Sequence, residues 1–183
     1  MMIMSSSTNN MSIESVPVSG LMIDNVKLAT ENQTIRVVCR MMYENKIGSI
    51  VILKESTYGN AEGERPIGIV TERDIVHLIG HSDPLLIDAP VYKVMSSALI
   101  TINPNSSIRD AMESMLQKDI RRLPVVDNKG KLVGIITDKD IFRTIVKNQS
   151  LVSSFLGDQI LVDQQSIYGK FTDYWFKDLL HTS

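Results

Sequence analysis

Apolar residues follow two different periodicities along this chain. Over 35–42 they recur at three- and four-residue spacing, which is typical of one buried face of a helix. Residues 49–53 and 66–70 are nearly continuous β-branched and apolar runs, typical of strands buried on both faces. Residues 74–81 return to helical spacing, and 25–29 reads as an extended segment. The pattern predicts the element order β-α-β-β-α.

The second half of the chain repeats this order. An extended segment is predicted over 98–102, a helix from Ile108, strands over 123–126 and 132–136, and a final helix over 140–148. Thr34 and Ser107 precede the first helix of each half, and both residue types are favoured as N-caps. Asp110 stands three residues after Ser107, where it can close a capping box.

The residues themselves are also duplicated. The string GIVTERDIV at 68–76 returns as GIITDKDIF at 134–142, an offset of 66 residues, whereas Met22 and Met95 are 73 apart. The difference falls in one loop, which is long after 53 and short after 126. We therefore expect an α+β fold of two similar units, which pack against each other because each small sheet needs a cover.

The repeats define the expected domain boundaries. Residues 1–16 are expected to be a disordered lead-in, 17–84 the first repeat and 85–149 the second. Residues 150–183 have no copy elsewhere and form a partly helical tail. Because this tail is rich in aromatic residues, it is expected to dock on its own core or on a second subunit.

Composition narrows the function classes. A net charge of −2 gives no support for a nucleic-acid or membrane-surface partner, and no apolar run approaches the length of a membrane span, so a cytoplasmic protein is expected. The single Cys39 excludes an internal disulfide. His77 and His81 lack a third ligand, and no nucleophile–base pair is evident. We expect neither a metal site nor a catalytic site nor a catalytic cofactor.

The repeated Thr-x-x-Asp has two interpretations. It can be a capping box at a strand-to-helix junction, with the Asp at the positive end of the helix dipole. It can equally be a nucleotide site, in which free helix amides attract phosphate and the carboxylate accepts from a ribose diol. One copy favours the cap, whereas two copies in register favour the site.

The two GI[VI]T[ED][RK]DI strings, with IGSIVI and IRRLPVVD ahead of them, resemble a tandem pair of cystathionine beta-synthase (CBS) domains, a Bateman module. The resemblance covers roughly 18–148. It implies two β-α-β-β-α units about a pseudo-two-fold axis, with clefts that bind AMP, ADP, ATP or S-adenosylmethionine. It also implies a non-enzymatic regulatory sensor that signals to an unknown effector protein.

The resemblance further implies roles for individual residues. Asp74 and Asp140 would hold ribose hydroxyls, Thr71 and Thr137 ribose or phosphate, and Arg73, Lys139, Arg121 and Arg122 phosphate; the backbone at Ala29, Ser49, Ile102 and Leu123 would line adenine. Gly48 and Ser49 stand where the second repeat has its Arg pair. The stronger site is therefore expected at Asp140 and Thr137, unless an Arg reaches the other repeat's ligand.

The sequence also predicts an assembly and leaves two possible functions. Apolar helix faces on a lone module predict a two-fold homodimer. The alternative to a ligand sensor is a structural dimerisation protein with no physiological ligand. The intact Thr and Asp of both copies favour the sensor.

Overall fold

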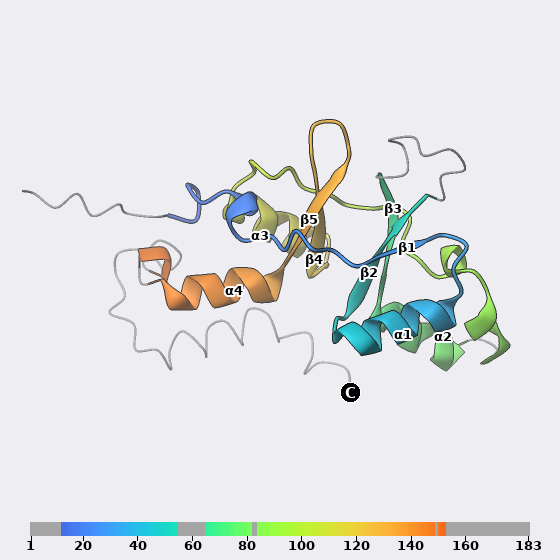
Figure 1. Cartoon of the computed structure of the whole chain (residues 1–183). Coiled ribbons are helices and arrows are strands. Elements are labelled where there is room, and N and C mark those ends of the chain that lie inside the picture. The colour runs from blue at the N-terminus through green and yellow to red at the C-terminus, as the bar shows by residue number, and fades with distance from the viewer. Residues whose placement is uncertain (1–11, 55–64, 82–83, 149, 153–183) are drawn as a thin grey trace, which may run out of the picture.

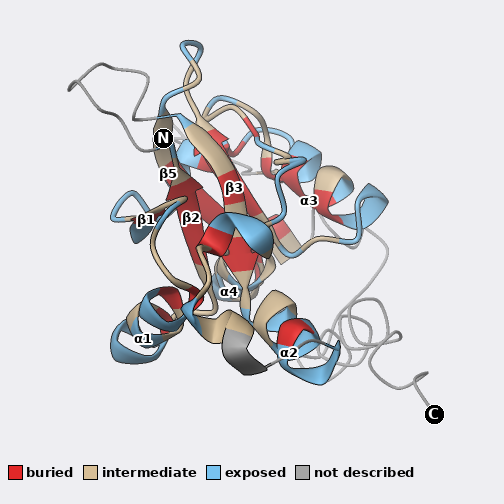
Figure 2. Cartoon of the chain, turned by 90° about the vertical axis from the view of Figure 1, so that its right-hand side faces the viewer, coloured by how far each residue is buried: buried red, intermediate tan, exposed pale blue. Residues whose placement is uncertain are grey.

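The computed structural model describes residues 12–54, 65–81, 84–148 and 150–152. Two α/β units lie side by side in Figure 1, one carrying β1, β2, β3, α1 and α2 and the other carrying β4, β5, α3 and α4. Figure 2 shows that buried residues follow the strands, while the helices keep exposed outer faces. The α+β class expected from the sequence is confirmed.

The first repeat has the predicted order of elements. These are β1 (Leu28–Thr30), α1 (Ile35–Asn45), β2 (Ser49–Leu53), β3 (Pro66–Thr71) and α2 (Glu72–His81). Strand β2 lies in the centre of the sheet, parallel to β1 and antiparallel to β3. The predicted N-cap is present, because Thr34 accepts a hydrogen bond from the amide of Val37.

The second repeat contains α3 (Ile108–Gln117), β4 (Arg122–Val126), β5 (Leu132–Thr137) and α4 (Asp138–Lys147). The capping box of Ser107 and Asp110 is formed. The strand predicted over 98–102 is reduced to one parallel bridge between Ile102 and Val125. Its loss has a local cause. In the first repeat Val51 donates its amide to Lys27, but Pro124 occupies the position of Val51 and has no N–H.

The segment that leads into each repeat packs on the other repeat. Pro17 bridges to Ser107 and Ile23 to Ile135, while Pro90 bridges to Thr34 and Ser96 to Ile69. The 3-10 helix Val18–Gly20 lies in the leading segment before β1, and the 3-10 helices Pro84–Asp88 and Val91–Lys93 lie in the leading segment before α3. Each repeat is therefore held to the other by its leading segment, an arrangement that we call the exchange of leading segments.

The hydrophobic core of each unit also contains residues from the leading segment of the other. Ile13, Val16 and Val18 are buried with the apolar residues of the second repeat, and Val91 is buried with those of the first. The sequence assigned 1–16 to a disordered lead-in, but its described part, from Ser12 to Val16, is ordered by this burial. Of the predicted tail, only 150–152 are described, and Leu151 joins the core of the second repeat.

The glycine of each repeated string makes this exchange possible. A Cβ on Gly68 would lie 2.6 Å from Sδ of Met95, and one on Gly134 would lie 2.7 Å from Sδ of Met22. The backbone carbonyls of Ser96 and Ile23 would each lie 3.1 Å away. A Cβ at either glycine would require the Met side chain to move and the crossing backbone to give way.

Candidate ligand-binding site

The two Thr-Asp pairs lie where a strand passes into a helix. At the β3–α2 junction, the amide and hydroxyl of Thr71 both donate to Oδ2 of Asp74, at 2.7 Å each. At the β5–α4 junction, the amide and hydroxyl of Thr137 donate to Oδ2 of Asp140, at 3.2 and 2.6 Å. Both Asp amides donate back to the Thr hydroxyl. The capping interpretation is therefore realised in both copies.

The cap uses only part of each carboxylate. The hydrogen bonds that each carboxylate accepts all end on Oδ2, and within the described ranges no donor reaches Oδ1 of Asp74 or Asp140. A carboxylate oxygen can accept further hydrogen bonds, and a vicinal diol is one suitable donor. Capping and ligand binding are therefore compatible at the same residue.

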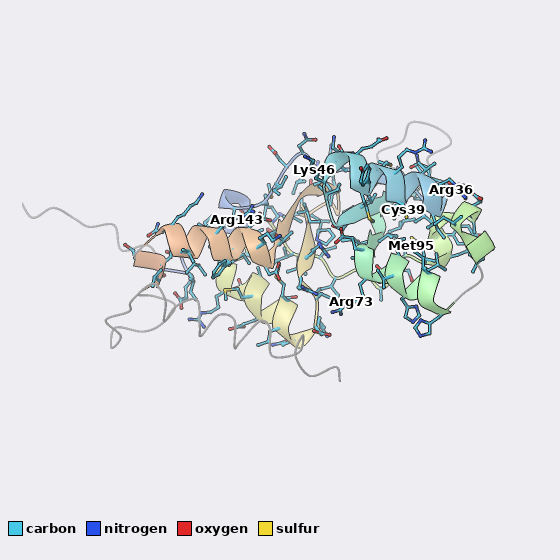
Figure 3. All side chains as sticks on the ribbon, turned by 90° about the horizontal axis from the view of Figure 1, so that it is seen from below. Arg36, Cys39, Lys46, Arg73, Met95 and Arg143 are labelled. Atoms are coloured by element: carbon cyan, nitrogen blue, oxygen red, sulfur yellow. The ribbon has the colours of Figure 1, made fainter. Side chains whose placement is uncertain are left out.

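A cleft of about 250 Å³ opens at the β3–α2 junction, between the two repeats. Its walls come from both of them: the first repeat supplies the Thr-Asp corner and Arg73, and the second supplies the start of β4 and the segment before α3. The lining residues are Ile69, Thr71, Arg73, Asp74, Ser96, Ala98, Leu99, Ile100, Asp119, Ile120, Arg121, Arg122 and Pro124. In Figure 3, Arg73 lies at the junction of the two repeats.

The Arg pair lies against the first repeat's Thr-Asp corner. Arg121 and Arg122 line the cleft that holds Thr71 and Asp74, although β4 pairs Arg122 with Thr137 in the sheet. The sequence had assigned this pair to Asp140 and Thr137, with crossing left open. The start of β4 therefore faces the strand-to-helix junction of the other repeat.

The guanidinium of Arg122 lies among carboxylates at the centre of the molecule. Burial lowers the pKa of Arg122, and the nearby Asp138, Glu72 and Asp74 oppose that lowering. Burial likewise raises the pKa of Asp138, against the effect of Arg121 and Arg122. The side chain fits there because Gly48 has no Cβ, which would lie 2.7 Å from Nη2 of Arg122. Arg122 is therefore a partly desolvated cation that lines the cleft.

The residues expected to line adenine are more deeply placed. Leu123, Ala29 and Ile102 are buried in the cores, and Ser49 is half-buried at the start of β2. Pro124 and Ile100 line the cleft instead, together with Asp119. Side chains alternate between the two faces of β4, so Pro124 shares a face with Arg122 and could have been predicted to line the cleft. Nothing in the sequence pattern brings residues 96–100 to this cleft.

Other kinds of site receive no support from the described ranges. His77 and His81 stack at 4.5 Å between ring centroids, and no group of three or more metal-ligating side chains gathers in the part of the chain that the structure describes. Among the described helices, none is both long and apolar enough to cross a membrane. Lys139 is exposed beside Thr137 and Asp140 at the start of α4.

Comparison with known proteins identifies the family. The family model of the CBS domain matches residues 18–81 and 91–147. The chain therefore belongs to the CBS domain family and carries two copies in tandem, which confirms the resemblance read from the repeated strings. Its two-repeat α+β architecture is shared with solved CBS domain proteins.

Three relatives illustrate the match. The protein is 34% identical over 131 residues to MK0525 of Methanopyrus kandleri, covering 72% of this chain and 63% of that protein. It is 33% identical over 137 residues to the CBS domain-containing protein YhcV of Bacillus subtilis, covering 75% and 91%. Its fold resembles CBS domain protein PAE2072 of Pyrobaculum aerophilum, solved complexed with AMP, at 26% identity and a TM-score of 0.61. That match covers 73% of this chain and all of the other.

Proposed function

We propose that this protein is a regulatory module that binds an adenosine-containing ligand between its two repeats and signals the bound state to a partner protein. The ligand is AMP, ADP, ATP or S-adenosylmethionine, and the module acts as a homodimer with no catalytic step of its own. A cytoplasmic location fits a sensor of these metabolites.

One observation carries the proposal. A single cleft joins Thr71, Arg73 and Asp74 of the first repeat to Arg121 and Arg122 of the second. These groups match the parts of a nucleotide: the carboxylate accepts from ribose hydroxyls, the guanidinium groups bind phosphate, and Ile69 and Pro124 offer apolar contact to a base. The AMP complex of the Pyrobaculum protein supports the same class of ligand.

The position of the cleft suggests how binding becomes a signal. A ligand held at Asp74 on one side and Arg121 on the other bridges the two repeats. It therefore stabilises whichever relative arrangement brings those groups within hydrogen-bonding distance of it. A partner that recognises this arrangement is then favoured or disfavoured by the ligand's differential affinity for the two states.

The second candidate is a structural dimerisation protein without a ligand. The observation in its favour is that Thr71 with Asp74 and Thr137 with Asp140 already have a purely structural role as caps. The two candidates are separated by comparing a cap inside a cleft with a cap outside it. Ser107 and Asp110 form such an outside cap: the amide of Ser107 donates to Asp110 and the amide of Asp110 donates to the hydroxyl of Ser107, and neither residue lines the cleft.

The test is calorimetric titration of the full chain with AMP, ADP, ATP and S-adenosylmethionine. Asp74→Ala and Asp110→Ala should each lower the free energy of unfolding by about 1 kcal/mol, because each removes the carboxylate half of one capping box and its hydrogen bond to the N-cap amide. Only Asp74→Ala should also weaken ligand binding, by on the order of tenfold or more, since it removes a charge-assisted hydrogen bond to ribose.

Asp140→Ala should weaken a second binding event in the same way. Equal stability losses in all three variants, with unchanged binding of every adenosine ligand, would reject the sensor and leave the structural candidate.

A further inference from the structure

A second cavity shares Asp74 with the cleft and has a different lining. Its volume is about 610 Å³, which is within the usual range of small-molecule sites. One wall is α2, and the other is the leading segment of the second repeat, over 86–94, which lies at the same end of the molecule as α1 and α2 (Figure 1). The lining residues are Ile35, Asp74, His77, Leu78, Leu86, Ala89, Lys93 and Val94.

The α2 wall combines polar and apolar side chains on one face of the helix. Asp74, His77 and Leu78 are spaced i, i+3 and i+4, so their side chains lie next to one another. Asp74 and His77 therefore place a carboxylate and an imidazole beside the apolar surface of Leu78.

The opposite wall is fixed to the start of α1 by backbone hydrogen bonds. The amide of Ile35 donates to the carbonyl of Ala89 at 3.0 Å, and the amide of Val91 donates to the carbonyl of Gln33 at 2.8 Å. The cavity is thus enclosed by hydrogen-bonded backbone on this side.

The same wall is packed more closely in the other repeat. Leu86 and Ala89 are only half-buried, whereas Ile13 and Val16, which stand 73 residues earlier in the leading segment of the first repeat, are 3% and 6% exposed. Ala89 is also smaller than Val16 by two methyl groups. The smaller side chain and the looser packing account for the space beside α2.

The cavity presents charges of both signs that do not pair with each other. Within the described ranges, no donor reaches Oδ1 of Asp74 and no carboxylate forms an ion pair with Lys93. The imidazole of His77 can donate or accept a further hydrogen bond. The remaining lining residues are apolar. A ligand with a single charge would satisfy one of these groups and be repelled by the other.

We infer that this cavity binds an apolar α-amino acid. The ammonium group of the ligand donates to Oδ1 of Asp74, and its carboxylate accepts from Lys93 and His77. The apolar side chain of the ligand packs on Leu78 and Leu86. A zwitterion with an apolar body is the ligand that meets the whole lining, because it matches both charges and the apolar surface.

The shared residue couples this site to the adenosine cleft. A ribose diol in the cleft and an ammonium group in the cavity both require Oδ1 of Asp74. Each ligand should therefore lower the affinity of the other, by the same factor in both directions. This coupling rests on the proposed function, whereas binding of the amino acid does not.

The first experiment is calorimetric titration of the full chain with leucine, methionine and phenylalanine in nucleotide-free buffer. N-acetyl-leucine, which lacks the ammonium group, should bind more weakly than leucine by on the order of tenfold, because the charge-assisted hydrogen bond to Asp74 is lost. Leucinamide, which lacks the carboxylate, should bind about two- to fivefold more weakly, the scale of an exposed ion pair. Each methylene that alanine lacks should weaken binding about fourfold.

A lysine variant tests the cavity from the side of the protein. Lys93→Met keeps most of the side-chain length and removes the charge at an exposed position, so the fold is retained, which melting followed by circular dichroism would verify. Leucine binding should weaken about two- to fivefold. Lys118→Met is the matched control, because Lys118 is also exposed and does not line the cavity. Its leucine affinity should equal that of the unmutated chain.

The coupling is measured by titrating AMP in the absence and in the presence of saturating leucine. The affinity for AMP should fall when leucine is bound. No leucine binding at millimolar concentration, or equal binding of leucine and N-acetyl-leucine, would overturn the amino-acid site. An AMP affinity that leucine does not change would overturn the sharing of Asp74. Leucine binding by a chain that binds no adenosine ligand would overturn the proposed function and support the amino-acid site.

Discussion

At the scale of single residues, Gly68 shows why the repeated string begins with glycine. Its absent Cβ leaves room for Met95 and for the backbone carbonyl of Ser96, which would lie 2.6 and 3.1 Å from that atom. A side-chain end can move aside, but the carbonyl belongs to a bridge that joins the two repeats.

Gly68→Ala should therefore lower the free energy of unfolding by about 1–3 kcal/mol, the usual cost of overpacking. Urea denaturation would measure the loss. Gly20→Ala is the matched control, because a Cβ there meets nothing within 4 Å. Gly20→Ala should leave stability unchanged or slightly raised. Equal effects of the two substitutions would show that the close approach at Gly68 has no energetic weight.

At the scale of elements, the sequence predicts local structure better than it predicts partners. Helical spacing and the Ser107 cap define α3, and apolar runs define β2 and β4, because these signals depend on near neighbours. The strand over 98–102 fails because Pro124, in the neighbouring strand, has no amide to donate. A sequence read one segment at a time carries no warning of that loss.

In the candidate site, too, the sequence predicts single residues better than it predicts which residues meet. Thr71 and Asp74 are predicted because their spacing repeats, and Arg121 and Arg122 because of the resemblance to CBS domains; all four line the cleft. Their meeting across the two repeats depends on the exchange of leading segments, which no local pattern encodes. Asp119 was missed for a similar reason, since a charged residue at the end of a helix is ordinarily read as exposed surface.

The leading segments are also held by ion pairs to the first helix of the other repeat. Arg109 of α3 pairs with Glu14, and Arg36, at the matching position of α1, pairs with Asp88 at 2.7 Å. The hydrogen bonds to Arg109 and Arg36 lower the pKa of Glu14 and of Asp88 from their ordinary values. A lowered carboxyl pKa stabilises the folded state above the ordinary pKa, and that stability is lost as pH falls through the lowered value.

The double variant Glu14→Gln/Asp88→Asn should therefore be less stable than the unmutated protein at neutral pH. The difference should shrink as pH falls through the lowered pKa values and vanish in stronger acid, when the native carboxyls are protonated as well. Urea denaturation across this range is the measurement. A difference that stays constant with pH would mean that packing, and not charge, holds the segments.

At the scale of the whole molecule, the two repeats differ in how their helices are covered. Ile145 of α4 is 1% exposed because it joins the core that contains Ile13 and Leu151. Ile79, at the matching position of α2, is 67% exposed. Val76 nearby is 69% exposed and Tyr43 of α1 is 85% exposed. The segments that flank the repeats thus complete the second helix pair and leave the first with an apolar face.

Exposed apolar residues on adjacent helices usually mark an interface, so we expect the homodimer to form through α1 and α2 of the first repeat. Ile79→Lys should turn the dimer into a monomer, because burying a charge at an apolar contact is costly. Light scattering at high micromolar concentration would report the change. Leu116→Lys is the control. Leu116 holds the position on α3 that Tyr43 holds on α1, and its side chain is 54% exposed. A protein that is monomeric before any substitution would rule out the dimer. A dimer broken by Leu116→Lys and not by Ile79→Lys would move the interface to the second repeat.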